Sequence, residues 1–215
     1  KLLGLEQAKL QGGTDKIEPL FYSDTLKVMS IGFLLQDQTN AIIWRGPMKH
    51  KVIKQFVTDV SWGNLDYLVV DCPPGTGDEP LSIVQLLGNP EGAVVVTTPQ
   101  QLAVLDVKKC ITFCRQLNLP VVGVIENMSG FICPHCNHRT DIFTGGGGKQ
   151  IAKDFDVPFL GSIPIDSEVV SACDSGKPFI NFNSQNTTAQ ALNYAFEPLL
   201  KPDMKNQTNK EAKVK

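Results

Sequence analysis

Short apolar runs rich in β-branched residues alternate along this chain with longer segments of helical period, and each run is bounded by Gly, Pro or Asp. This alternation is typical of a parallel sheet whose strands are joined by crossover helices. The sequence therefore predicts an α/β fold with a doubly wound, mostly parallel sheet flanked by helices. The expected strands are 67–70, 93–97, 121–125 and 159–163, with a weaker candidate at 28–34, and the expected helices are 48–60, 80–87, 101–117 and 149–155.

The longest expected helix, 101–117, carries an apolar face that includes two cysteines. The residues at that spacing are Ala103, Val107, Cys110, Cys114 and Leu117. Side chains three, four and seven residues apart share one face of a helix. Because no His or third Cys lies nearby in sequence, and free Cys is often buried, we expect Cys110 and Cys114 to pack in the core.

The chain of 215 residues is long enough for one domain with a sizeable core, which we expect over residues 1–200. Residues 201–215 lose their apolar side chains and are expected to form a disordered tail. The net charge of -2 leaves no basic surface for nucleic acid or for an anionic membrane, so neither partner is expected. No run approaches the roughly 20 apolar residues that span a bilayer.

The six cysteines lie in dissimilar contexts, without the spacing of a disulfide framework. A reducing compartment fits this usage best, and we expect the protein to be cytoplasmic.

Residues 71–78, with the sequence DCPPGTGD, directly follow the expected strand 67–70. Ligands of doubly wound folds lie beyond the carboxyl ends of strands, where Asp71 could reach Mg²⁺ or its water shell, as a Walker B aspartate does. Pro73 cannot continue the strand, and Gly75 and Gly77 let backbone N–H groups approach a phosphate. Asp78 then begins a helix. The segment suits a switch that senses a γ-phosphate.

A phosphate-binding loop of the Walker A type is expected beside such a switch, and the chain lacks one. Residues 145–149, GGGGK, have Phe143 where the first glycine should be, and Gln150 replaces the hydroxyl that binds Mg²⁺. We interpret this stretch as a mobile, glycine-rich connection that leads into a helix.

Cys133 and Cys136 form a Cys-x-x-Cys motif within an expected loop at about residues 129–141. Two thiolates at this spacing are the common half-site for Zn²⁺ or an iron–sulfur cluster. Because the chain has no second such motif, closure requires His135 or His138, or the same loop of a second subunit. A thioredoxin-like redox pair is a further alternative, but that motif opens a helix directly after a strand.

Taken together, these motifs closely resemble the Mrp/ApbC-type iron–sulfur cluster carriers of the ParA/MinD-like branch of P-loop ATPases. The resemblance runs from about Leu2 to Ile180 and rests on residues 44–48, 62–67, 71–78, 125–129 and 133–136.

The resemblance implies a P-loop NTPase-like fold and a homodimer in which Cys133 and Cys136 of each subunit bridge one [4Fe–4S] cluster. It also implies that ATP and Mg²⁺ control transfer of the cluster to apo iron–sulfur proteins. Asp71 would act at the Mg²⁺ site, and the switch would face the γ-phosphate. Asn127 would contact the adenine, and a loop containing Pro164, Ile165 and Asp166 would close over the base. We expect the neighbouring Glu126 to be structural.

Members of the resembled family carry a two-lysine P-loop and a switch aspartate upstream of the position that matches Lys1. ATP hydrolysis is therefore an expectation for the complete protein, and the segment alone is expected to bind nucleotide weakly or not at all. Two alternatives stay open, which are a ParA/MinD-like positioning ATPase and a zinc-stabilised interaction module without catalysis.

Overall fold

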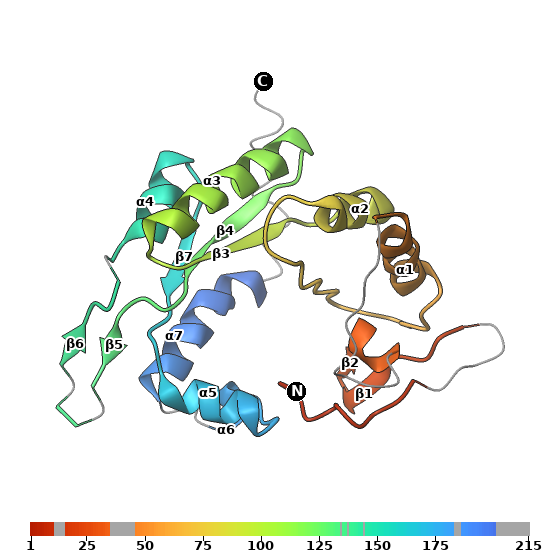
Figure 1. Ribbon diagram of the computed structural model, residues 1–215, viewed down its shortest axis with the longest axis horizontal. Helices are drawn as coiled ribbons and strands as arrows, with labels where there is room; N and C mark the ends of the chain where they lie inside the picture. The colour runs from red at the N-terminus through yellow and green to blue at the C-terminus, as the bar shows by residue number, and fades with distance from the viewer. Residues whose placement is uncertain are drawn as a thin grey trace. The chain divides into compact units, whose positions relative to one another are not determined.

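Helices and strands alternate along most of the chain (Figure 1). The computed structural model describes residues 1–10, 16–34, 46–133, 135–136, 138–143, 145–182 and 186–200, so the predicted tail at 201–215 lies outside the described residues. The elements are β1 (Leu20–Ser23), β2 (Leu26–Val28), η1 (Ile31–Leu34), α1 (Gly46–Thr58), α2 (Asp78–Leu87), β3 (Ala93–Thr97), α3 (Gln101–Gln116), β4 (Val121–Glu126), β5 (Phe131–Ile132), β6 (Arg139–Thr140), α4 (Gly147–Asp154), β7 (Phe159–Ser162), α5 (Ser167–Asp174), α6 (Phe179–Phe182), α7 (Thr187–Phe196) and η2 (Glu197–Leu200).

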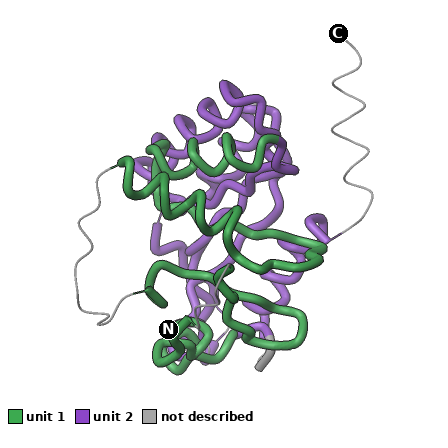
Figure 2. The backbone as a smooth tube through the Cα atoms, turned by 90° about the vertical axis from the view of Figure 1, so that its right-hand side faces the viewer, with its two compact units in different colours: residues 1–88, 172–178 green, residues 89–171, 179–215 purple. Residues whose placement is uncertain are grey.

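The chain divides into two compact units (Figure 2). The first comprises residues 1–88 with 172–178, and the second comprises 89–171 with 179–215. The organisation of residues 1–200 as one domain stays a prediction.

The second unit is built on a parallel sheet with the strand order β3-β4-β7. Val95 pairs with Val124, and Ile125 pairs with Gly161. Helices α3 and α4 pack on one face of this sheet, and α7 packs on the other (Figure 1). Helices on both faces of a parallel sheet confirm the predicted doubly wound α/β class.

Successive residues of β4 supply the cores of the two faces. Val124 packs beneath α3 and α4, whereas Ile125 packs against α7, because neighbouring side chains of a strand point to opposite faces. Each fully buried Val or Ile side chain contributes about 1.5–3 kcal/mol relative to an exposed one. This double burial explains why β4 is almost wholly apolar.

Helix α3 buries a slightly different stripe from the predicted one. The buried residues are Val104, Val107, Ile111 and Cys114, while Cys110 is only half-buried and packs at the edge of the cluster. Val104 and Ile111 therefore take the places in the buried stripe that were predicted for Ala103 and Cys110. Their larger, β-branched side chains fill more of the space between α3 and the sheet. The prediction that Cys114 is a core residue is confirmed.

The predicted strand at 67–70 is wrong. These residues have no strand conformation, and the side chain of Val69 is 87% exposed. A parallel strand forms only where a neighbouring strand accepts its hydrogen bonds, and within the described part of the chain no strand pairs with this run. The weaker candidate at 28–34 is also wrong, since β2 ends at Val28 and a 3₁₀ helix, η1, follows it.

In the first unit, β1 and β2 form an antiparallel pair, and α1 packs against α2. Ile17, which precedes β1, forms a β-bridge with Val60, which follows α1. This bridge connects the segment that leads into the β1–β2 pair with the segment that leaves α1. The ion pair between Lys49 and Glu79, at 2.5 Å, joins α1 to the first turn of α2.

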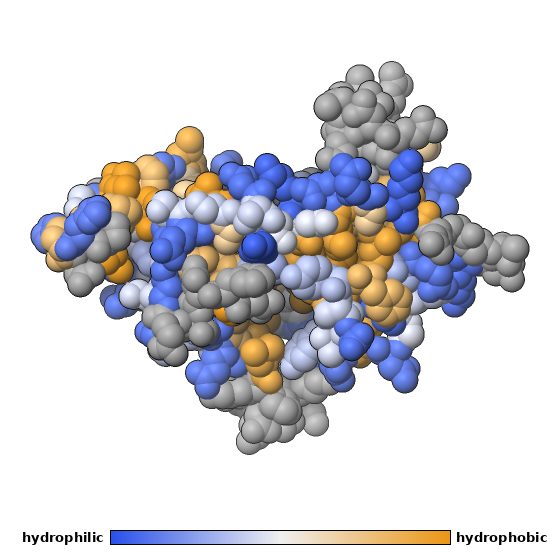
Figure 3. Space-filling view, turned by 90° about the horizontal axis from the view of Figure 1, so that it is seen from below, coloured by the Kyte–Doolittle hydropathy of each residue, from blue (hydrophilic) through white to orange (hydrophobic). Residues whose placement is uncertain are grey.

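No helix among the described residues is long and apolar enough to cross a membrane. The surface seen in Figure 3 carries hydrophilic residues with apolar residues interspersed among them. Exposed apolar side chains on β3 include Val94 and Val96.

Candidate functional site

Cys133 and Cys136 lie at the tip of a short hairpin formed by β5 and β6. The strands pair Phe131 with Thr140 and Ile132 with Arg139. The backbone N–H of Cys133 donates to the carbonyl of His138 at 3.0 Å and extends this pairing to the tip. Cys133 is half-buried and Cys136 is exposed, so both thiols are presented beyond the last paired residues of the hairpin.

The surroundings of Cys133 favour its thiolate. The backbone N–H of His135, then that of Cys136, and finally the Cys136 thiol hydrogen-bond to the sulfur and lower the pKa of Cys133 below the usual thiol value. A thiolate is the form that ligates metal. The turn therefore favours the form of the Cys133 sulfur that could bind a metal.

A complete metal site is not present in one chain as far as its described residues extend. No group of three or more His, Cys, Asp or Glu side chains converges there, so neither His135 nor His138 joins the two cysteines as a third ligand. Zinc and iron–sulfur clusters require four protein ligands at a closed site. The donor set is chemically suited to either, but it supplies only two of the four.

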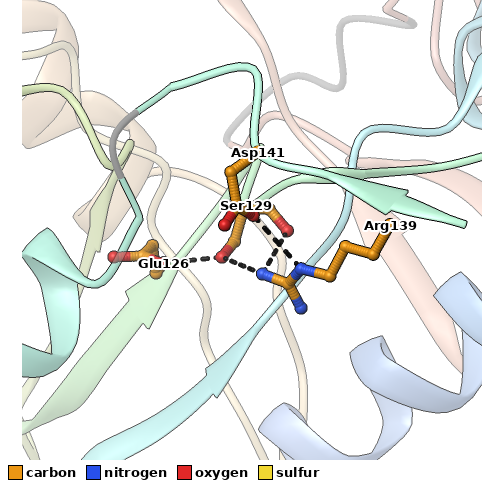
Figure 4. Close-up of polar contacts among 4 residues, drawn as sticks. All are labelled: Glu126, Ser129, Arg139 and Asp141. Atoms are coloured by element: carbon orange, nitrogen blue, oxygen red, sulfur yellow. Dashed lines mark hydrogen bonds and ion pairs between the residues drawn. The ribbon is translucent and has the colours of Figure 1, made fainter.

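The base of the hairpin is fastened by polar contacts (Figure 4). Arg139 donates from Nη2 to the backbone oxygen of Ser129 at 3.2 Å, and its Nε lies 3.2 Å from Oδ1 of Asp141. The hydroxyl of Ser129 donates to Oε1 of Glu126 at 2.7 Å. These contacts connect the hairpin to the carboxyl end of β4.

The carboxyl ends of β4 and β7 bring the predicted adenine-binding residues to one edge of the sheet. The backbone N–H of Asn127 donates to Thr97 at 2.7 Å, and its Oδ1 accepts from the N–H of Met128 at 2.9 Å. Its amide nitrogen makes no hydrogen bond to another described residue, so it is available to donate to an acceptor on a base. Ile165 lies alongside, since its N–H donates to Gly130 at 2.7 Å.

Asp166 and Pro164 belong to the same loop but differ in what they can offer. The carboxylate of Asp166 accepts from the N–H of Glu168 at 2.8 Å and from the hydroxyl of Thr188 at 2.8 Å. Both oxygens are thus engaged, one at the start of α5 and the other at the start of α7. Pro164 is half-buried and has no N–H to donate. The loop can close over a ligand mainly through its backbone and apolar surface.

The predicted switch, residues 71–78, is an exposed segment of the first unit that ends at α2. Gly75 has a φ of +96°, which favours glycine, and a side chain there would meet nothing within 4 Å. The backbone at Gly75, with Pro73 nearby, is therefore open to an approaching phosphate, which fits the predicted nucleotide.

Gly77 is the N-cap residue of α2, and Asp78 and Glu79 form its acidic first turn. A hydrogen bond from Lys49 lowers the pKa of Glu79. Asp71 is exposed in the same segment, and no group of three or more metal-ligating side chains converges among the described residues, so the assignment of Asp71 to Mg²⁺ stays a prediction. The switch residues and the residues near Asn127 belong to different compact units.

Half of the glycine stretch 145–148 is packed, which corrects the interpretation of all four residues as a mobile connection: Gly145 and Gly146 are exposed, but the next two are not. Gly147 and Gly148 are buried in the first turn of α4. A Cβ on Gly147 would lie 2.7 Å from Val104, and one on Gly148 would lie 2.9 Å from Glu126. Because the N–H of Gly148 already donates to Glu126, this helix start is used for packing against the sheet.

The sequence interpretation treated Glu126 as merely structural and did not include Ser129 or Arg139 among the site residues. The signal that could have indicated Glu126 is its place as the single acid at the end of an otherwise apolar strand. No signal of spacing pointed to Ser129 and Arg139, because their contact is created by the fold of the hairpin.

Comparison with solved structures defines the class of fold. The chain has a TM-score of 0.70 and 39% identity to a nucleotide-binding protein in complex with ADP from Archaeoglobus fulgidus, with 83% of this chain and 68% of that one covered. It also matches the cell division ATPase MinD of Pyrococcus furiosus, with a TM-score of 0.52 and 21% identity over 74% of this chain and 62% of that one. The MinD likeness shows the fold alone. The match of residues 1–200 to a ParA family model places the chain in the ParA/MinD-like class of α/β P-loop NTPases.

Within this class, the chain belongs to the family of NUBPL iron-transfer P-loop NTPases, which it matches over residues 1–200. It is 50% identical over 180 residues to an iron-sulfur cluster carrier protein of Methanocaldococcus jannaschii, covering 84% of this chain and 62% of that protein. It is 46% identical over 185 residues to a cytosolic Fe-S cluster assembly factor NUBP2 homolog of Nematostella vectensis, covering 85% of this chain and 68% of that protein. The resemblance to iron–sulfur cluster carriers is confirmed.

Proposed function

We propose that the protein carries a [4Fe–4S] cluster between two copies of its Cys133–Cys136 hairpin and transfers it to apo iron–sulfur proteins under the control of ATP. The observation that carries this proposal is the half-site itself. Two thiols are presented on one hairpin, and no third ligand accompanies them within the described ranges.

A homodimer completes the set of four ligands without any residue beyond the two cysteines of each copy. A two-fold axis through the cluster repeats each ligand, so Cys133 and Cys136 of both copies supply four thiolates. The exposure of Cys136 at the hairpin tip leaves room for a second copy. Because the cluster is cargo, a site shared between two subunits can also open when they separate.

The nucleotide part of the proposal assigns ATP to two groups of residues. Asp71 acts at the Mg²⁺ site, and the remaining switch residues, Pro73, Gly75, Gly77 and Asp78, face the phosphates. Asn127 contacts the adenine, and Pro164, Ile165 and Asp166 close over the base. The open backbone at Gly75 and the available amide of Asn127 support these roles. An ADP complex of the Archaeoglobus fulgidus relative supports a nucleotide in this family.

The proposed activity and partners refer to the whole protein, since this chain spans 62% of the length of the archaeal relative. ATP hydrolysis supplies the change that releases the cluster, and the recipients are apo-proteins that provide their own thiolates. A cytoplasmic location is supported by the name of the Nematostella vectensis relative.

Anaerobic reconstitution with iron and sulfide tests the proposal. Wild-type protein should become brown and hold about four irons per dimer, whereas Cys133→Ala and Cys136→Ala should hold none. Cys173→Ala is the matched control, because Cys173 is half-buried outside the hairpin and should leave the iron content unchanged. One zinc per chain would instead indicate an interaction module, and binding of neither metal would favour a positioning ATPase.

A further inference from the structure

One carboxylate is buried at the end of β4. Glu126 is only 1% exposed, and its two oxygens accept from different parts of the fold. Oε1 accepts from the hydroxyl of Ser129 at 2.7 Å, and Oε2 accepts from the N–H of Gly148 at 2.6 Å. A buried carboxylate is costly unless it is fully hydrogen-bonded, and bonds to such a group are strong. Glu126 therefore holds both donors firmly.

A side-chain connection runs from Glu126 to the metal-binding hairpin (Figure 4). Nη2 of Arg139 donates to the backbone oxygen and to the hydroxyl of Ser129, at 3.2 and 3.4 Å. Arg139 pairs with Ile132, the residue next to Cys133. The carboxylate, the hydroxyl and the guanidinium thus form a continuous polar relay that ends beside the metal-binding cysteines.

A backbone connection joins the same strand end to the loop proposed to cover the base. The N–H of Ile163 donates to Glu126 at 2.8 Å, and the N–H of Ser129 donates to Ile163 at 2.8 Å. Ile165 then donates to Gly130 and bridges Phe131, which lies two residues before Cys133. A shift of residues 163–166 is therefore passed to the root of the hairpin.

Resting on the proposed function, we infer that Glu126 is a positioning residue that couples the base-side loop, residues 163–166, to the Cys133–Cys136 hairpin. Nucleotide bound beside Asn127 moves the loop and the root of the hairpin together, because Glu126 and its ladder of hydrogen bonds make them one packed body. The state of the nucleotide is in this way transmitted to the two thiols from the side of the base.

Thiol reactivity in the full-length, metal-free gene product tests this coupling without a cluster. Cys133 and Cys136 are alkylated with iodoacetamide with and without saturating ADP, and the rates are read by mass spectrometry of their shared peptide. ADP should change the wild-type rate by about fivefold or more, the lower end of typical allosteric coupling.

Three variants interrupt the relay at successive points. In Glu126→Gln, Ser129→Ala and Arg139→Gln, the ratio of rates with and without ADP should fall to about one, while ADP affinity is kept. Ser129→Ala and Arg139→Gln leave the bond between Glu126 and Gly148 in place, so they carry the test should Glu126→Gln fail to fold. Asp154→Asn is the matched control, since this exposed carboxylate of α4 bonds Gln150 and Lys108 outside the relay, and it should keep the wild-type ratio.

Relay variants that keep the wild-type ratio would overturn the inference, as would a wild-type protein that binds ADP without any change in thiol reactivity. Either result leaves the proposed carrier function standing if iron is still bound at about four per dimer. Failure of the wild-type protein to bind ADP would contradict both the inference and the proposed nucleotide control.

Discussion

Two neighbouring cysteines of α3 show how single residues acquire properties that their spacing does not reveal. Cys114 is 2% exposed and Cys110 lies half-buried four residues earlier. A hydrogen bond from the Cys114 thiol lowers the pKa of Cys110 to about 7, although burial opposes the shift. Because the thiolate is the reactive form of cysteine, Cys110 is expected to react more readily than an ordinary thiol.

We predict that Cys110 is alkylated with a midpoint near pH 7, because its thiolate is populated there. Cys114→Ala should raise that midpoint toward the usual thiol value, and alkylation rates between pH 6 and about pH 10 measure it. The same shift makes the stability of the fold depend on pH. Since the pKa of Cys110 is lower in the folded chain, its thiolate stabilises the fold above the unfolded-state pKa, and this contribution is lost as the pH falls through about 7. An unchanged midpoint in Cys114→Ala would show that the hydrogen bond does not set the pKa.

The core of the second unit gives a prediction that depends on one side chain. Ile111, on the side of α3 that packs against the sheet, is 0% exposed. Ile111→Ala should lower the free energy of unfolding by about 2–5 kcal/mol, because it leaves a cavity that the sheet cannot fill. Leu105→Ala, at a position of the same helix that is 54% exposed, should change it by less than about 0.5 kcal/mol. Urea unfolding measures the free energy of unfolding of both variants. Equal losses in the two variants would contradict the assignment of Ile111 to the core.

The candidate site could be predicted from the sequence only where local spacing carries the chemistry. Cys133 and Cys136 are adjacent enough that a turn must bring them together. The contact of Arg139 with Ser129 depends on strand pairing in the hairpin, and that of Gly148 with Glu126 joins residues 22 positions apart. Such contacts arise from the tertiary fold and leave no periodic pattern.

At the scale of elements, apolar pattern predicted strands well where the sheet is built within the described chain. The bounds of β3 agree with the prediction, and those of β4 and β7 differ from it by one residue at their ends. Residues 67–70 have the same apolar pattern but no strand conformation. An apolar pattern in the sequence indicates that a segment suits a buried strand, but it does not show whether a neighbouring strand is present to pair with it.

The start of α4 provides a prediction for the glycine stretch. Gly148→Ala would place a Cβ 2.9 Å from that of Glu126 and 3.1 Å from Thr97. Overpacking of this kind costs about 1–3 kcal/mol, which exceeds the gain of up to about 1 kcal/mol in helix propensity. Chemical denaturation should therefore show a less stable protein.

Gly145→Ala is the matched control in the same stretch. The nearest atom to its Cβ would be a carboxylate oxygen of Asp141 at 3.6 Å, an ordinary contact. We expect stability to stay the same or to rise by less than about 1 kcal/mol. Equal losses in the two variants would mean that the packing of Gly148 on Glu126 is not what requires glycine.

At the scale of the whole molecule, the central claim is that one chain holds half of a metal site. The hairpin supplies two thiols, the family is that of iron-transfer P-loop NTPases, and the described residues add no third ligand. A cluster that needs four thiolates therefore requires a second copy, and the amount of dimer should follow the amount of cluster.

Native mass spectrometry of the anaerobically reconstituted protein measures chains and iron in the same particle. The account predicts a species of two chains with one [4Fe–4S] cluster, which is lost on treatment with an iron chelator and does not form from Cys136→Ala. A single chain that holds its metal alone, at any protein concentration, would contradict the shared site.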